Sequence, residues 1–194
     1  MIDIEIKSLQ EGYNLTDDGE LKDYLGTRFT KLPDGSSELS QPRMIECVIQ
    51  MVGLDYVSNR TKMHDTPPAI STTLLDNDPN DEPRIRDWNY SSVVGALSYL
   101  QEMVRLDITF AVQQCARFCN NPRQQNEDAV KRIFRYLLRT KEKGIVLRPD
   151  KSRGLECCVN ADWAGSWQDR SSNNPLSAHS RSGYVIMYAG CPII

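Results

Sequence analysis

The sequence lacks any apolar run that approaches the roughly 20 residues needed for a membrane-spanning helix. Its first residues, Met1 to Glu5, have neither the basic start nor the apolar core of a signal peptide. We therefore expect an intracellular protein, cytoplasmic or nuclear, with no membrane partner. Metal-binding patterns are also scarce, because there are only 2 histidines and no Cys-x-x-Cys pair among the 6 cysteines. These absences disfavour a zinc site, and without a secretory signal no disulfide is expected.

The composition is not that of a disordered or fibrous chain. The 194 residues are 40% hydrophobic and 25% charged, which is ordinary for a globular protein. The charge is unevenly distributed, however: residues 1–88 carry 9 Lys and Arg against 17 Asp and Glu, and residues 89–194 carry 14 against 9. A site for a polyanion is therefore expected in the C-terminal half, although unused surface charge explains the asymmetry equally well.

The acidic half predicts a β-hairpin, a helix and a linker. Residues 25–40 have the pattern of two short strands, with Pro33-Asp34-Gly35 as the turn between them. Ser40 is the expected N-cap of the helix and Gly53 its end. Residues 63–88 are rich in proline and acidic side chains, which predicts an acidic linker. The apolar stripe of the helix consists of Met44, Ile45, Val48, Ile49 and Val52.

The basic half begins with three predicted helices. Apolar spacing places the first over residues 93–104 and the second over residues 107–119, with Asp107 at its start. The third runs from Asn126 to about Lys141 and has two different faces. Its apolar face consists of Val130, Ile133, Phe134, Leu137 and Leu138. Its opposite face carries what we call the basic ridge: Lys131, Arg132, Arg135 and Arg139.

The basic ridge has two interpretations. It is either a solvated helix face that happens to be cationic, or a surface that contacts nucleic-acid phosphates. No acidic residue stands four positions after any basic residue of the ridge, so we expect these charges to be unpaired, which favours the second interpretation. Charge alone does not separate DNA from RNA.

After Gly144 the apolar pattern changes to period two. It predicts strands at residues 145–148, 155–160 and 182–188, with a fourth beginning at Cys191. No helical pattern follows to cover the apolar face of such a sheet. This C-terminal region is therefore expected to be an incomplete domain.

Several segments form an ordered set of motifs: GELKDYLG at 19–26, YSSVVGALSYL at 90–100, LDITFAV at 106–112, KRIFRYL at 131–137, VNADWAG at 159–165 and RSGYV at 181–185. In this order and spacing they resemble the polyproteins of copia-type retrotransposons. The resemblance implies an α+β fold, in which thumb-like and connection-like segments of a reverse transcriptase precede an incomplete ribonuclease H-like β-meander. The implied divisions are 1–62 for the end of the palm and the thumb, 63–88 for the linker, 89–143 for the helical connection and 144–194 for the first ribonuclease H strands.

The resemblance also implies what the catalytic sites need. Both enzymes of such polyproteins use two metal ions, Mg²⁺ or Mn²⁺, held by carboxylates. The Tyr-x-Asp-Asp motif of the polymerase does not occur in this sequence. Asn160 stands where the ribonuclease H pattern has its first metal-binding aspartate, and an amide brings no charge to hold the cations. Asp162 would share a strand face with Asn160 and is a weak candidate metal contact. We therefore expect no intact catalytic set and no cofactor.

These inferences predict a catalytically inactive part of a reverse transcriptase and ribonuclease H polyprotein. Its expected ligand is a template-primer, either an RNA–DNA hybrid or a DNA duplex, bound through the basic ridge without sequence preference. Its other expected partner is the remainder of the polyprotein. Two alternatives stay open: a residual metal-dependent nuclease around Asp162, and a protein-interaction module adopted by a host.

Overall fold

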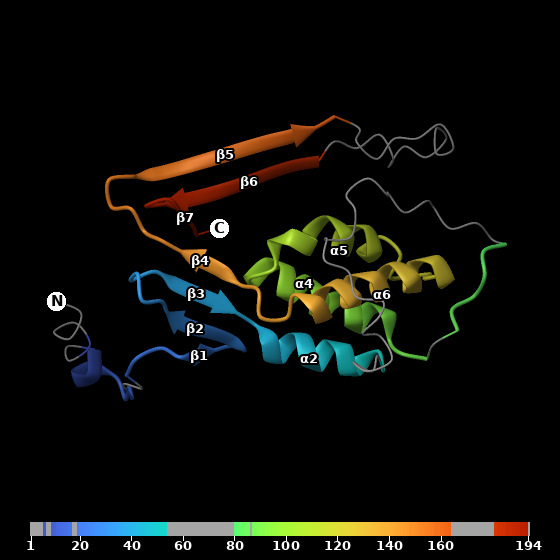
Figure 1. Ribbon diagram of the computed structural model, residues 1–194, viewed down its shortest axis with the longest axis horizontal. Coiled ribbons are helices and arrows are strands. Elements are labelled where there is room, and N and C mark those ends of the chain that lie inside the picture. The colour runs from blue at the N-terminus through green and yellow to red at the C-terminus, as the bar shows by residue number, and fades with distance from the viewer. Residues whose placement is uncertain are drawn as a thin grey trace.

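The computed structural model describes residues 6, 9–16, 19–53, 80–85, 87–163 and 181–193. These residues form two antiparallel sheets and a cluster of helices, which confirms the predicted mixture of helix and strand (Figure 1). Most of the predicted linker 63–88 lies outside the described residues, as do Ala164 and Gly165 of the ribonuclease H-like motif. The divisions at 62, 88 and 143 stay predictions.

One sheet contains the predicted hairpin. Its strands are β1 (Asp23–Tyr24), β2 (Thr27–Lys31), β3 (Ser37–Ser40) and β4 (Ile145–Leu147), in that spatial order. The turn between β2 and β3 has Gly35 at a φ of +82°, a conformation that glycine adopts without steric cost. The Asp34 carboxylate accepts hydrogen bonds from the backbone N–H and the hydroxyl of Ser36. The predicted hairpin and its turn are therefore confirmed.

The position of β4 differs from the prediction. We expected this strand to be the first of the ribonuclease H-like sheet, but it pairs antiparallel with β3, with Leu39 opposite Ile145. Just before β4 the backbone passes very close to β3 at Gly144. A Cβ atom at this position would collide with the backbone carbonyl of Leu39, so the close approach requires glycine. A three-residue apolar strand carries no sequence signal of its partner, so the pairing was not predictable from periodicity.

The predicted helices are all present with small changes at their ends. They are α2 (Pro42–Met51), α4 (Tyr90–Met103), α5 (Thr109–Ala116) and α6 (Gln124–Arg139), with a 3₁₀ turn η2 (Leu106–Ile108) before α5. Ser40 is not the N-cap of α2, because it is the last residue of β3 and Gln41 occupies the cap position. Asp107 does not cap α5, because it lies within η2. Asn89 caps α4 by accepting a hydrogen bond from the backbone N–H of Ser92.

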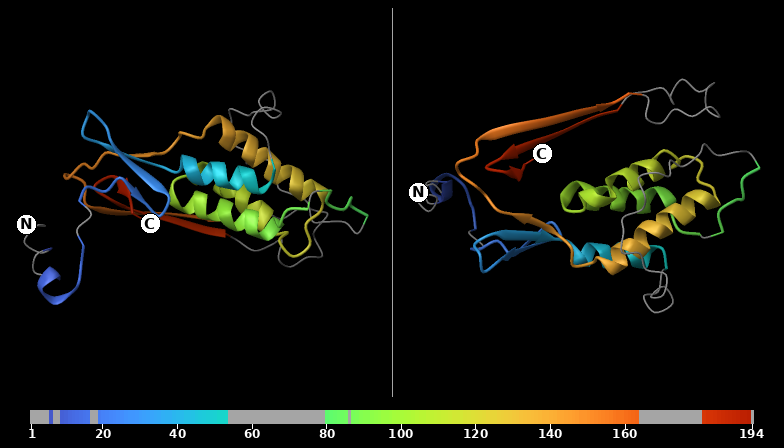
Figure 2. Two further views of the ribbon diagram at one scale, coloured as in Figure 1. Left: turned by 90° about the horizontal axis from the view of Figure 1, so that it is seen from below. Right: turned by 45° about the horizontal axis from the view of Figure 1, so that its top comes forward.

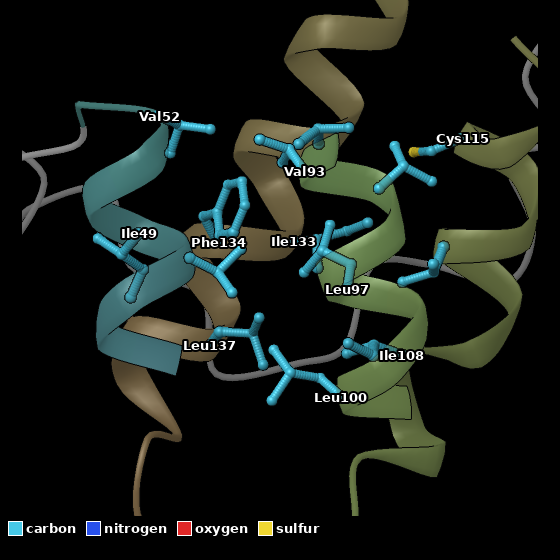
Figure 3. Packing of buried hydrophobic residues seen from close by; sticks show 14 of the residues in the cluster. Ile49, Val52, Val93, Leu97, Leu100, Ile108, Cys115, Ile133, Phe134 and Leu137 are labelled. Carbon is cyan, nitrogen blue, oxygen red and sulfur yellow. The ribbon is translucent and has the colours of Figure 1, made fainter. Parts of the chain in front are cut away.

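The helices enclose one hydrophobic core. Figure 3 shows Phe134 and Leu137 of α6 directed toward Ile49 of α2 and Leu97 of α4. All five residues predicted for the apolar face of α6 are buried. Helix α6 is therefore fixed in orientation by its burial, which leaves its basic side away from the core.

The second sheet consists of β5 (Leu155–Asp162), β6 (Arg181–Tyr188) and β7 (Cys191–Pro192), paired antiparallel in that order. This is the predicted meander without β4. Figure 2 shows β5 and β6 as a long arm that reaches out from the end of β4. Most described side chains of β5 are exposed, including those of both Asn160 and Asp162. Within the described residues, the sheet is therefore only thinly covered.

Candidate nucleic-acid interface

The outer side of α6 carries the basic ridge. Arg132 and Arg139 are exposed and Arg135 is half-buried. Among the described residues, neither Arg132 nor Arg135 has a hydrogen-bond or ion-pair partner, and the Nε atom of Arg135 is buried without one. Two guanidinium groups three positions apart on a helix lie on the same side. They provide a pair of unneutralised donors of the kind that binds phosphate.

Lys131 does not fit the prediction of an unpaired ridge. Its Nζ lies 2.6 Å from Oε1 of Glu127 and 3.4 Å from Oδ1 of Asp128, and its side chain is only 18% exposed. The prediction of unpaired charge rested on the position four residues after each basic residue of the ridge. Glu127 and Asp128 instead precede Lys131, by four and three positions. The expectation of unpaired charge is therefore wrong for Lys131.

Glu127 is fully buried, and a segment from the predicted linker supplies part of its counter-charge. Arg84 places its Nε 3.5 Å from Oε2 of Glu127, so the carboxylate lies between Arg84 and Lys131. The Arg84 guanidinium also covers the ring of Trp88 at 4.4 Å, and the ring of Trp88 stacks on Tyr90 at 5.7 Å. This cluster has no signal in the sequence, because Arg84 precedes its partner Glu127 by 43 residues.

The same segment also contacts the first turn of α6. The backbone N–H of Gln124 donates to the carbonyl of Glu82, and the side chain of Gln125 donates to Asp81. Together with Glu127 and Asp128, these contacts make the N-terminal end of α6 acidic, while its last turn carries Arg139. This arrangement agrees with the helix dipole. It restricts the candidate site to Arg132, Arg135 and Arg139.

A second polar cluster joins η2 to the end of α6. Arg105, which is only 1% exposed, donates from Nε and Nη2 to the two carboxylate oxygens of Asp107, both at 3.0 Å. Arg105 also donates to the carbonyl and hydroxyl oxygens of Thr140, and Tyr136 donates to Asp107 at 2.5 Å. Nζ of Lys143 lies 3.5 Å from the same carboxylate.

The electrostatics of this cluster follow from its geometry. Burial opposes ionisation of Asp107, but the hydrogen bonds from Arg105 and Tyr136 and the charges of Arg105 and Lys143 outweigh it, so its pKa lies below the usual value. The hydrogen bond with Tyr136 is the main reason that the pKa of Lys143 is raised. Every strong donor of Arg105 has an acceptor, so this cluster stabilises the fold and offers little to a ligand.

The candidate metal position lies on β5. Asn160 and Asp162 occupy alternate positions of one strand, so they share a face, as expected. In the register of the sheet Gly183 stands opposite Asn160 and Arg181 stands opposite Asp162. Within the described parts of the chain, no three His, Cys, Asp or Glu residues are grouped so that they could hold a metal ion. A metal contact at Asp162 stays a prediction.

The described helices include none that is both long and apolar enough to span a bilayer. No protein-family model matches the chain, and no solved structure matches it. Curated proteins do match over nearly its whole length.

The matching curated proteins include products of mobile elements. The retrovirus-related Pol polyprotein from transposon RE1 of Arabidopsis thaliana is 28% identical over 188 residues, covering 97% of this chain and 12% of that protein. The corresponding polyprotein from transposon TNT 1-94 of Nicotiana tabacum is 27% identical over 187 residues, covering 94% of this chain and 13% of that protein. A transposon Ty5-1 protein of Saccharomyces cerevisiae is 26% identical over 188 residues, covering 96% of this chain and 56% of that protein. The chain thus spans only a small part of the two plant polyproteins.

Proposed function

Since this chain belongs with the polyproteins of copia- and Ty-type retrotransposons, we propose that it is a part of their reverse transcriptase and ribonuclease H region that binds nucleic-acid duplexes. The proposed ligand is a template-primer, as an RNA–DNA hybrid or a DNA duplex. We further propose that the chain has no catalytic activity of its own and that its other partner is the remainder of the polyprotein.

The observation that carries the proposal is the unpaired arginine pair on α6. Burial of Val130, Ile133 and Phe134 holds the helix against the core, so Arg132 and Arg135 cannot turn inward to find a carboxylate. Guanidinium groups that lack an internal partner pay no cost of breaking an ion pair when they meet a phosphate. Lys131, by contrast, would first have to leave Glu127 and Asp128.

Binding of this kind has a characteristic salt dependence. Each phosphate that a protein neutralises on B-form DNA adds about −0.9 to the slope of log K against log salt concentration. Two arginine contacts therefore account for a slope of about −1.8, and the removal of both should reduce the measured slope by about that amount. Because phosphates carry no sequence information, the affinity should be similar for unrelated duplexes.

Fluorescence anisotropy with a labelled RNA–DNA hybrid and a labelled DNA duplex tests the proposal. The double variant Arg132→Gln/Arg135→Gln should bind several-fold more weakly than the original chain and with the smaller salt slope. Arg148→Gln/Arg153→Gln is the matched control, since it removes the same number of positive charges from arginines that are already paired with Asp34 and Glu156. Equal weakening by both double variants would show that only net charge matters and would refute the site.

The proposed lack of catalysis needs a separate measurement. Asn160 cannot supply the charge of the aspartate expected at its position. Incubation of a labelled hybrid with Mg²⁺ or Mn²⁺ should therefore leave it uncut. Cleavage that disappears in Asp162→Asn would instead establish a residual nuclease at that residue.

A further inference from the structure

The β5–β6 hairpin has one face that carries no charge. Cross-strand partners point to the same side of a sheet, and the register sets Leu155 opposite Tyr188 and Val159 opposite Tyr184. We call this side the apolar face. Its residues are Leu155, Cys157, Val159 and Ala161 of β5 and Ser182, Tyr184, Ile186 and Tyr188 of β6.

Four large side chains of the apolar face are mostly exposed. Leu155 is 70% exposed, Val159 77%, Tyr184 65% and Tyr188 60%. The full surface of an aromatic side chain is ~150–250 Å², and that of an aliphatic one is somewhat smaller. Multiplied by the exposed fractions, these surfaces sum to about 500 Å² for the four residues. That lies within the range of the largest apolar patch on a typical monomer, about 300–600 Å², and such a patch is often functional.

The opposite side of the same hairpin is different in character. It carries Glu156 and Asp162 on β5, and Arg181 stands opposite Asp162 in the register. Both charged residues among the described side chains of the two strands therefore occupy that side, because the side-chain period of a strand is two. The apolar face has no cationic side chain to bind a phosphate backbone, which disfavours a nucleic-acid duplex as its partner.

We propose that two copies of this chain associate through the apolar faces of their β5–β6 hairpins. A two-fold interface sets the same patch of each copy against itself, which brings like charges together on a charged patch but not on a face that has none. The four exposed side chains of each copy together bury about 1,000 Å², which is at the lower limit for a specific interface. The association is therefore expected to be reversible, with a dissociation constant in the micromolar range.

The position of Cys157 allows the geometry to be tested. It lies midway between Leu155 and Val159, near the centre of the apolar face, while its neighbour Cys158 belongs to the opposite face. Both thiols are free and exposed. Stacked sheets lie about 10 Å apart. A two-fold axis through the centre of the apolar face therefore places the two Cys157 residues at about this separation. A short bis-maleimide can span it, whereas a direct disulfide cannot.

Analytical ultracentrifugation of the full chain over about 1–100 μM measures the association. The expected result is a shift from the mass of one chain to that of two. Val159→Lys should shift the dissociation constant upward at least tenfold, and Tyr184→Ser should have a similar effect without adding charge. Asn160→Lys is the matched control, since this exposed residue is next to Val159 on the opposite face, and it should leave the dimer unchanged. Circular dichroism of each variant verifies that the fold is retained.

Cross-linking gives the second readout. The bis-maleimide should produce a covalent dimer that Cys157→Ser abolishes and Cys158→Ser does not. A chain that stays monomeric over the whole concentration range overturns the proposal and leaves the face to another part of the polyprotein. A dimer that is equally sensitive to Val159→Lys and Asn160→Lys, or that cross-links equally through both cysteines, also overturns it.

Discussion

Replacement of Asp107 by alanine tests the polar cluster that joins η2 to α6. The substitution leaves the buried guanidinium of Arg105 with only the oxygens of Thr140 as acceptors among the described residues. Removal of one partner from a buried ion pair costs about 3–5 kcal/mol. The side chain of Asp107 is itself 20% exposed, so water can enter the gap, and we expect a loss at the lower end of that range, about 3 kcal/mol in the free energy of unfolding.

Urea unfolding followed by far-UV circular dichroism measures this loss. Asp107→Asn should cost less than Asp107→Ala, because an amide oxygen still accepts from Arg105 or Tyr136. Glu142→Ala is the control: this exposed carboxylate lies 3.7 Å from Arg28 and 3.8 Å from Lys141, and its removal should leave the unfolding midpoint unchanged. If Asp107→Ala costs less than about 1 kcal/mol, which is the range of exposed ion pairs, the argument that the cluster supports the fold is refuted.

Three further predictions concern stability and reactivity. The pKa of Asp107 is lowered in the folded state, so its contribution to the free energy of unfolding is complete above the ordinary carboxyl pKa of about 3.9. That contribution disappears as the pH falls through the lower pKa of the folded state. The stability should therefore fall less steeply with pH below about pH 4 in Asp107→Asn than in the original chain. Phe134→Ala should reduce the free energy of unfolding by about 3–5 kcal/mol in the same urea assay, since the ring is completely buried. Burial raises the pKa of the Cys115 thiol to about 12. A disulfide reagent should therefore modify the exposed Cys157 and Cys158 at once, and Cys115 only upon unfolding. Fast labelling of Cys115 would contradict its burial.

Local features of the fold could be predicted from the sequence. The apolar face of α6 and the stripe of α2 follow from a spacing of three and four residues, which depends only on helix geometry. The turn between β2 and β3 follows from the side-chain chemistry of Asp34 and the freedom of Gly35. These elements needed no knowledge of what packs on them.

Features that depend on distant partners could not be predicted in this way. The pairing of Lys131 with Glu127 is local, but its strength depends on the burial of Glu127, which Arg84 makes possible from outside the helix. The network around Asp107 likewise needs Tyr136 of α6 and Thr140 just after that helix, so the sequence alone suggested only a helix cap. The partner of β4 also depended on a contact across more than a hundred residues of chain. Periodicity contains no information on any of these contacts.

The pairing of β3 with β4 has a consequence for how the chain can be divided. Leu39 and Ile145 are neighbours in the sheet, and the whole helical cluster lies between them in the sequence. Closure of such a long loop has an entropic cost, so this ladder should form late, after the helices have brought its two strands together. Separate expression of the parts before and after Gly144 would leave β3 with an open edge and β4 without a partner, and neither product should reproduce the stability of the intact chain.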